Sequence, residues 1–342
     1  MYIGFFSNYN FYNNNRMLRD PTSSIGDNLM YPVFYLSKQL EKLGHKTATI
    51  DTDSIKKFDA VLFLDFPTLK NKYFNQLLKL GHNNMYLLIA ESPIIKPDNL
   101  DAENHKYFKK IFTWEDDIID NKKYFKINYS HNIPKEFNFD LGKDKKLCAI
   151  IAGNKSDNHP AELYSERIMA IRWFEKNHPD DFDLYGLGWD KYNFYGKFLG
   201  VKLARLNRLK FLTKLLGPHY PSWRGQVRSK NETYKNYKFS ICYENVKGFN
   251  GYITEKIFDC FLAGCVPIYL GAPNITSHIP KNTFIDKRNF DNYESLYKYI
   301  KNMPDSEYEG YLKAINDFLT SDKSYQFSAE YFADTLIKEM TT

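Results

Sequence analysis

The sequence lacks any run of about eighteen apolar residues, the length that a membrane-spanning helix requires. Its first residues, Met-Tyr-Ile-Gly-Phe-Phe, are typical of a strand and not of a signal peptide, in which a charged stretch precedes an apolar one. The four cysteines lie within apolar runs and lack the spacing of a metal site, so they are predicted to be buried free thiols. We therefore expect a cytoplasmic protein.

The signatures of several enzyme classes are also missing. The sequence contains no Gly-x-Ser-x-Gly, no Gly-x-x-x-x-Gly-Lys-Ser/Thr and no histidine pair at the spacing of metal ligands. Two Asp-x-Asp strings, at residues 51–53 and 181–183, have a spacing that can hold a divalent cation on a diphosphate. Chance readily produces this spacing in a chain rich in aspartate, so we interpret both strings as structural and predict no metal ligands.

The charge is only mildly positive. The formal net charge is +6, and the lysines form short scattered clusters without a long basic run, which argues against a nucleic-acid partner. Such a charge suits an anionic substrate such as a nucleoside diphosphate, or a loose peripheral association with the inner surface of a membrane. A solvated lysine surface explains the same charge without any partner.

The length predicts two domains, because 342 residues exceed what one hydrophobic core usually supports. Short apolar runs alternate with amphipathic stretches, which is typical of strand–helix–strand units around a parallel sheet. The irregular stretch 134–146 is interpreted as a linker. The predicted division is 1–140, 146–320 and a C-terminal helix in 321–342, with packing of that helix on the first domain as an option.

The expected elements follow from the apolar runs and from the glycines that end helices. In the first domain the strands are 2–6, 47–50, 60–66, 85–90 and 111–114, and the helices are 29–43 and 69–80. In the second domain the strands are 147–152, one ending in 183–186, 238–243 and 266–270, and the helices are 165–177 and 254–263.

The most informative stretch is a predicted strand followed by a polar loop, a helix and a second strand. Glu244 and Asn245 follow the first strand at its carboxyl end, where open parallel sheets bind ligands. The helix begins near Thr254, so Glu255 and Lys256 lie in its first turn, beside backbone N–H groups that have no partner within the helix. A pyrophosphate fits there, and Lys256 would neutralise the charge of a leaving nucleotide. An ordinary first turn with a solvent-facing Glu–Lys pair is an equal alternative.

This stretch carries three linked motifs, Tyr243-Glu244-Asn245, Tyr252-Ile253-Thr254-Glu255-Lys256 and Ala263-Gly264-Cys265-Val266-Pro267. It resembles the family 10 glycosyltransferases, the α1,3-fucosyltransferases, whose motifs read Phe-Glu-Asn, Tyr-Val-Thr-Glu-Lys and Ala-Gly-x-Val-Pro. Tyr243 and Ile253 depart from the family pattern. The resemblance covers residues 237–271.

The resemblance implies an α/β fold of the GT-B type, with two Rossmann-like domains whose parallel sheets face a central cleft. It implies that the N-terminal domain binds the acceptor, that the C-terminal domain binds GDP-fucose, and that the anomeric carbon of fucose is inverted. Position by position, it implies donor contacts from Asn245, Tyr252, Glu255 and Lys256. In the family, the lysine contacts the diphosphate and the glutamate the sugar or ribose.

The family also places an arginine against the phosphates, on the helix that follows the first strand of the donor domain. Two arginines of this chain lie on the corresponding predicted helix. Arg167 is the better match because it lies near the start of the helix, and Arg172 is the alternative.

Inverting transfer needs a base at the acceptor hydroxyl, since the attacking oxygen must lose its proton. Glu91 follows the predicted strand 85–90 and precedes Ser92-Pro93, which predicts an acid at the carboxyl end of a strand. Similar family members carry Glu-Ser-Pro at the matching place, with the glutamate as the proposed base. We therefore assign catalytic roles to Glu91 and Glu255. An acid that caps a turn is the alternative for Glu91.

The segment 111–117 is where many family members carry an arginine-rich stretch, which this chain keeps poorly. Trp114 and Glu115 are candidate acceptor contacts here. A core tryptophan is the alternative for Trp114.

Together, the resemblance predicts an enzyme that transfers L-fucose from GDP-fucose to an N-acetylglucosamine- or glucose-type glycan, oligosaccharide or lipid-linked, in α1,3 linkage. No cofactor is expected to be required, and stimulation by Mn²⁺ or Mg²⁺ is left open. The alternatives are a GT-B glycosyltransferase for another nucleotide sugar and a non-catalytic protein that binds glycans or sugar nucleotides.

Overall fold

The computed structural model describes residues 1–22, 27–137, 139, 144–192, 194, 197–198 and 201–341. The chain divides into two compact units. Unit 1 consists of Met1–Lys135, Phe249–Glu255 and Leu319–Thr342, and unit 2 consists of Glu136–Gly248 and Lys256–Phe318. Residues 138 and 140–143 of the predicted linker, and residue 342 of the predicted C-terminal helix, lie outside the described residues.

Unit 1 is built on a parallel sheet in the order β2-β1-β3-β4-β5-β6. Its strands are β1 (Tyr2–Ser7), β2 (Lys46–Thr49), β3 (Ala60–Leu64), β4 (Met85–Ile89), β5 (Lys110–Thr113) and β6 (Tyr124–Lys126). The sequence did not predict β6, because three residues with one buried side chain give no detectable period. The chain moves outward from β1 to β2 and returns on the other side as β3, so the carboxyl ends of β1 and β3 flank a switch point, where such sheets bind ligands.

The helices of unit 1 are α1 (Arg16–Arg19), α2 (Tyr31–Lys42), α3 (Lys72–Lys79), α4 (Ala102–His105) and α11 (Ala329–Thr341). Helix α2 lies within the predicted range 29–43 and buries its apolar side in the core. Helix α3 begins three residues later than the predicted start at residue 69. The reason is Asn71, whose side chain accepts hydrogen bonds from the backbone N–H groups of Tyr73 and Phe74 and thereby caps the helix.

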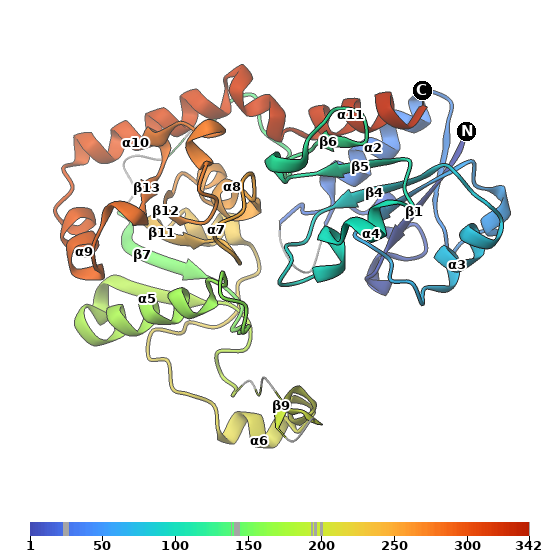
Figure 1. Ribbon diagram of the computed structural model, residues 1–342. Coiled ribbons are helices and arrows are strands. Elements are labelled where there is room, and N and C mark those ends of the chain that lie inside the picture. The colour runs from blue at the N-terminus through green and yellow to red at the C-terminus, as the bar shows by residue number, and fades with distance from the viewer. Residues whose placement is uncertain are drawn as a thin grey trace. The chain divides into compact units, whose positions relative to one another are not determined.

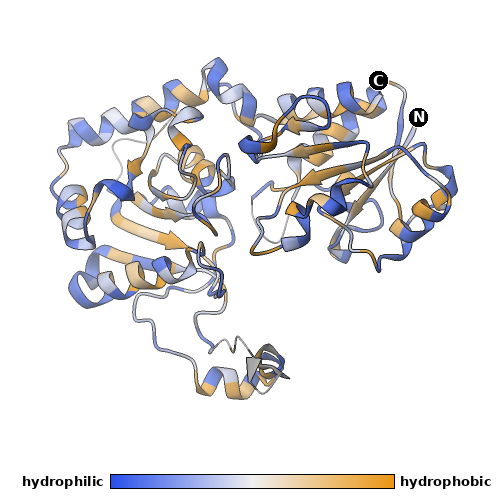
Figure 2. Cartoon of the chain, viewed as in Figure 1, coloured by the Kyte–Doolittle hydropathy of each residue, from blue (hydrophilic) through white to orange (hydrophobic). Residues whose placement is uncertain are grey.

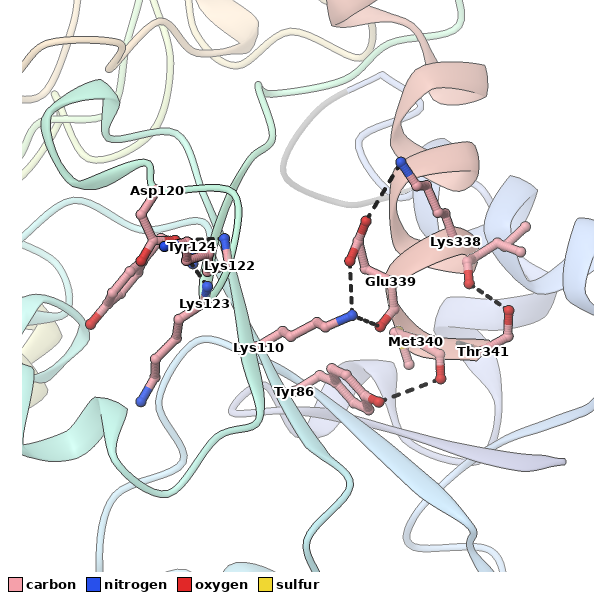
Figure 3. Close-up of polar contacts among 11 residues, drawn as sticks. Tyr86, Lys110, Asp120, Lys122, Lys123, Tyr124, Lys338, Glu339, Met340 and Thr341 are labelled. Carbon is pink, nitrogen blue, oxygen red and sulfur yellow. Dashed lines mark hydrogen bonds and ion pairs between the residues drawn. The ribbon is translucent and has the colours of Figure 1, made fainter.

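Helix α11 belongs to unit 1 although it comes last in the chain. It packs beside α2 (Figure 1) and contributes Phe332 and Leu336 to the same core. Figure 3 shows that Lys110 of β5 forms hydrogen bonds with the last turns of α11. The Lys110 Nζ atom donates to the backbone oxygen of Glu339 at 2.9 Å and to the Glu339 Oε2 atom at 2.8 Å. The Tyr86 hydroxyl of β4 donates to the Met340 carbonyl oxygen at 3.4 Å.

Unit 2 is built on a second parallel sheet, in the order β13-β12-β11-β7-β8. Its strands are β7 (Lys146–Ile151), β8 (Phe182–Tyr185), β11 (Tyr237–Tyr243), β12 (Val266–Leu270) and β13 (Ile285–Asp286), while β9 (Lys197–Phe198) pairs separately with β10 (Val201–Lys202). The helices are α5 (Tyr164–Asn177), α6 (Lys210–Leu215), α7 (Lys230–Tyr234), α8 (Glu255–Leu262), α9 (Tyr293–Lys301) and α10 (Asp305–Leu319). The switch point of this sheet lies between β7 and β11.

The two sheets confirm the predicted α/β class with parallel strands. Figure 2 shows hydrophobic strands in both units, with hydrophilic residues on the outer sides of the helices. All four cysteines are buried and free, as predicted. Within the described ranges, no helix combines the length and the apolar character that crossing a membrane would demand.

The contact between Lys110 and Glu339 predicts a measurable contribution to stability. Only 18% of the Lys110 side chain and 13% of the Glu339 side chain are exposed, so Lys110→Met leaves a largely buried carboxylate without this partner. We expect the free energy of unfolding in urea to fall by about 1–3 kcal/mol.

Lys338→Met is the matched control. Its Nζ atom lies 3.9 Å from the other oxygen of Glu339, and its side chain is 79% exposed. We expect a change below about 0.5 kcal/mol. Equal losses in the two variants would contradict the special role of Lys110.

Candidate active site

The three motifs form a strand end, a loop, a helix start and a turn. Strand β11 ends at Tyr243, so Glu244 and Asn245 leave the carboxyl end of the central strand of the sheet. Helix α8 begins at Glu255, which puts Glu255 and Lys256 in its first turn, as predicted. Gly264 ends this helix in a left-handed conformation (φ +64°) that glycine adopts without strain, and β12 follows at Val266.

A buried carboxylate lies at the centre of this arrangement. The Glu244 side chain has no exposed surface, and its Oε2 atom lies 3.1 Å from Nζ of Lys256. A carboxylate removed from water needs a charged or hydrogen-bonding partner, because an uncompensated buried charge is costly. Lys256 is such a partner, and 23% of its side chain remains exposed.

Arg167 binds the same strand end from helix α5. It is buried, and its Nη2 atom lies 2.7 Å from the Tyr243 carbonyl oxygen, 2.8 Å from the Glu244 carbonyl oxygen and 3.0 Å from Oδ1 of Asn245. A cation at the carbonyl end of a parallel strand compensates the partial negative charges gathered there. This contact also orients the Asn245 amide, whose oxygen is directed to Arg167.

Arg172, the alternative from the sequence, lies elsewhere. Its Nη1 atom donates to Glu175 at 2.7 Å and to the His219 carbonyl oxygen at 2.8 Å, and its guanidinium lies over the Tyr220 ring. Of the two arginines, Arg167 is thus the one that contacts the first motif.

A cavity of about 690 Å³ opens at the carboxyl edge of the sheet in unit 2. It is lined by residues at or after the ends of β11, β12 and β13 and by residues just before and at the start of α5: Pro160, Ala161, Glu166, Lys247, Gly248, Leu270, Gly271, Pro273, Lys287, Arg288 and Phe290. Gly271 borders Glu244 closely, since a Cβ atom there would lie 2.5 Å from the Glu244 Cγ atom. The cavity therefore adjoins the buried carboxylate.

Sequence reasoning missed the three cations of this cavity, Lys247, Lys287 and Arg288. Lys287 and Arg288 directly follow β13, which is only two residues long and gave no strand signal. Burial lowers the pKa of the Lys287 amine. Arg288 is oriented by Asp286, which accepts bonds from its Nε and Nη2 atoms at 2.9 and 2.6 Å. A basic pair after a short apolar run was the signal that could have found them.

The loop Phe249–Glu255 belongs to unit 1 by its contacts. The Asn250 amide donates to Asp117 Oδ1 at 3.0 Å, and the Asp116 backbone N–H donates to the Asn250 carbonyl oxygen at 3.3 Å. Gly251 has φ +80°, and a Cβ atom on it would overlap the Trp114 carbonyl oxygen. Only glycine fits this position without displacing backbone.

Aromatic packing holds the second motif to unit 1. The Tyr252 ring lies 4.8 Å from the Trp114 ring and 6.1 Å from the Tyr129 ring, both edge to face. Trp114 is 1% exposed, so the core alternative describes it and its ring offers almost no surface to an acceptor. Glu115 is half-buried, and burial together with Asp117 and Asp116 raises the pKa of its carboxyl.

Glu91 follows β4, where a buried carboxylate fixes the backbone. Asp65 Oδ1 accepts hydrogen bonds at 2.9 Å from the N–H groups of Ala90 and Glu91, and at 2.7 Å from the Asn99 amide. Asp65 itself has φ +61°, a conformation that is strained for a residue with a side chain. A strained backbone conformation persists only where surrounding contacts enforce it. Here the hydrogen bonds of the Asp65 carboxylate are those contacts, and they also position the Glu91 backbone.

The Glu91 side chain lies among tyrosines of unit 1. The Tyr9 hydroxyl is 3.4 Å from Glu91 Oε1, and burial together with the charge of Glu91 raises the pKa of Tyr9 to about 12. The Tyr129 hydroxyl donates to the Ala90 carbonyl oxygen. Burial raises the pKa of Tyr129, and the neighbouring Tyr252, Glu91 and Glu255 raise it further. Both predicted catalytic acids thus influence the pKa of the Tyr129 hydroxyl.

The two Asp-x-Asp strings have structural partners. Asp183 accepts from Lys146 and from the Tyr237 hydroxyl, each at 2.8 Å, and Asp181 pairs with Lys301 at 2.7 Å. Asp51 accepts from the Asn14 N–H at 2.9 Å, and Asp53 pairs with Lys57 at 2.8 Å. These contacts agree with a structural interpretation of both strings.

Comparison with known proteins finds a family model that matches the part of the chain with the three motifs. Residues 204–333 match the family model described as Glycosyltransferase family 10 (fucosyltransferase) C-term. An alpha-(1,3)-fucosyltransferase from Helicobacter pylori is 39% identical over 75 residues, which is 22% of this chain and 16% of that protein. The mouse 4-galactosyl-N-acetylglucosaminide 3-alpha-L-fucosyltransferase 9 is 37% identical over 119 residues, a third (33%) of each chain. The chain thus spans a third or less of the length of these curated relatives.

The fold likeness extends further than the sequence likeness. The crystal structure of an alpha1,3-fucosyltransferase with GDP-fucose matches with a TM-score of 0.56 at 15% identity, covering 100% of this chain and 90% of that one. At this identity the match speaks for the fold alone, and it confirms the predicted GT-B type with two Rossmann-like units. Together with the family model, these matches confirm the resemblance first indicated by the three motifs: residues 204–333, which include all three, match the model of the C-terminal part of the family 10 glycosyltransferases.

Proposed function

We propose that the chain is an inverting glycosyltransferase that transfers L-fucose from GDP-fucose to a hydroxyl of an N-acetylglucosamine- or glucose-type glycan, in α1,3 linkage. The observation that carries the proposal is the strand end of β11, where Lys256 and Arg167 converge on Tyr243–Glu244–Asn245. The names of the two fucosyltransferase relatives support fucose as the transferred sugar, and the name of the mouse relative supports the acceptor class.

In unit 2, the proposed role of the cavity is to bind GDP. Its volume falls within the range of small-molecule sites. Lys247, Lys287 and Arg288 give it the positive charge that a diphosphate requires. Lys256, at the N-terminal end of α8, pairs with Glu244, which borders Gly271 of the cavity. The side-chain oxygen of Asn245 accepts a hydrogen bond from Arg167. The proposed role of its amide nitrogen is to donate a hydrogen bond to GDP-fucose.

The proposed chemistry is a single displacement. The acceptor oxygen forms a bond to the fucose anomeric carbon as the bond from that carbon to the diphosphate oxygen breaks, and the acceptor proton passes to Glu91. Lys256 stabilises the negative charge that develops on GDP. Glu255, in the first turn of α8, binds the sugar or ribose. We propose that no cofactor is required, because Lys256 and the cations that line the cavity supply the positive charge that a metal ion supplies in other transferases.

The test is release of GDP in the presence of a glycan acceptor with terminal N-acetylglucosamine or N-acetyllactosamine. We expect turnover with GDP-fucose, in the presence of EDTA, and little with GDP-mannose or UDP-sugars. Glu91→Gln keeps the shape of the side chain but removes the base, so we expect kcat to fall at least about 100-fold while GDP binding persists.

Glu103→Gln is the matched control, because this exposed glutamate of unit 1 pairs with a surface lysine, Lys106. It should leave kcat unchanged. Turnover with a different donor only would remove the fucosyltransferase assignment, and unchanged turnover in Glu91→Gln would remove Glu91 from the mechanism.

Gly251 of the motif loop allows a second test, with another left-handed glycine as the control. Gly251→Ala brings a Cβ atom into the Trp114 carbonyl oxygen, whereas Gly44→Ala, which follows α2 at φ +82°, meets no atom within 4 Å. Both substitutions carry the backbone cost of a left-handed alanine, about 1–2 kcal/mol.

Because only Gly251→Ala also displaces the loop that carries Tyr252 and Glu255, we expect kcat/KM for the donor to fall at least about tenfold more in that variant. The measurement is steady-state kinetics, with thermal unfolding recorded in parallel. Equal kinetics in the two variants would show that packing of this loop on Trp114 does not position the donor residues.

A further inference from the structure

Residues 205–216 of unit 2 expose an unusual amount of apolar surface. They comprise the end of a 3₁₀ helix (Leu203–Arg208) and helix α6, and we call them the basic apolar segment. The Phe211 side chain is 82% exposed and Leu215 is 69% exposed, while Leu209 and Leu216 are each about half exposed, at 53% and 49%. Isolated exposed apolar residues are common, but four large ones within eight residues form a patch of the kind that marks an interaction site.

The orientation of the segment is the reverse of that in an ordinary surface helix. Helical spacing along α6 places Phe211, Leu215 and Leu216 on one side and Lys210 and Lys214 on the other. An ordinary amphipathic helix buries its apolar side in the core. Here the buried residue is the small Thr213, 3% exposed, whose carbonyl oxygen accepts from the Tyr192 N–H at 2.7 Å.

The charge around the patch has one sign. Arg205, Arg208, Lys210 and Lys214 are all exposed, and the sequence contains no aspartate or glutamate between Asp190 and Glu232. Figure 1 shows α6 standing apart from the sheet of unit 2, and Figure 2 shows the mixture of hydrophobic and hydrophilic residues along it. Large apolar side chains flanked by cations complement a surface that is negatively charged outside and apolar beneath.

We propose that the basic apolar segment binds the surface of an anionic lipid bilayer, with Phe211 and Leu215 inserted among the acyl chains and the flanking lysines and arginines at the lipid phosphates. This proposal concerns a surface of unit 2 away from the donor cavity, and it stands independently of the sugar that the enzyme transfers. It would bring the enzyme to the surface on which a lipid-linked acceptor is held.

The test is sedimentation of the full chain with vesicles. Vesicles of phosphatidylcholine with phosphatidylglycerol should bind the protein, vesicles of phosphatidylcholine alone should bind it at least about tenfold more weakly, and high salt should weaken the binding. The double variant Phe211→Ser/Leu215→Ser removes two exposed apolar side chains and should lose at least about tenfold in affinity for the anionic vesicles without a loss of thermal stability.

Leu43→Ser is the matched control. Leu43 is 60% exposed, close to the value for Leu215, but lies in unit 1 at the end of α2, and its replacement should leave vesicle binding unchanged. Insertion can be followed directly with an environment-sensitive fluorophore on Leu215→Cys, because the four natural cysteines are buried. Its emission should shift to the blue with anionic vesicles, and the same label on Leu43→Cys should not respond.

Failure of the wild-type chain to sediment with anionic vesicles would overturn the proposal, as would equal binding by the double variant. A wild-type dimer in analytical ultracentrifugation that the double variant abolishes, without vesicle binding, would instead assign the patch to a contact between two copies of the chain.

Discussion

The buried pair between Glu244 and Lys256 is the interaction on which the proposed donor site depends. Glu244 has no exposed surface, so its charge has to be compensated from within the protein, and Lys256 provides a cation at 3.1 Å. This requirement fixes the first turn of α8 against the end of β11. In the donor site we propose, the same pair holds Lys256 in place before the diphosphate arrives, which reduces the entropy lost on binding. Arg167 adds to this by binding the carbonyl oxygens of the same strand end.

The second constraint is the loop between β11 and α8. By its contacts the loop belongs to unit 1, and the chain passes into unit 2 between Glu255 and Lys256. Within this motif, Tyr252 packs against Trp114 and Tyr129, whereas Lys256 pairs with Glu244. In the mechanism we propose, Glu255 binds the sugar or ribose and Lys256 binds the diphosphate. Two adjacent residues of the motif therefore contact different parts of the donor.

The sequence predicted most elements that have a strong hydrophobic period, such as β12, whose bounds agree with the expected 266–270. It failed for elements defined by few residues. Strand β13 has only two, and with it the basic pair Lys287 and Arg288 at the cavity went unnoticed.

Side-chain surroundings were harder to predict than elements. The sequence left open whether Arg167 or Arg172 lies at the motif, because both lie on α5, and only the fold shows which side of that helix faces β11. It likewise offered Trp114 as an acceptor contact, whereas the loop that buries its ring comes from residues more than a hundred positions later. Long-range contacts of this kind leave no local pattern to detect.

The most direct test of the central claim is the affinity for GDP of the double variant Glu244→Gln/Lys256→Met, measured by titration calorimetry. Removing Lys256 alone would leave a buried carboxylate uncompensated and could unfold the site, but the double variant removes both charges and keeps the fold. If Lys256 binds the diphosphate, this folded variant will bind GDP at least about tenfold more weakly than the wild-type chain. Wild-type affinity for GDP in the double variant would contradict the account.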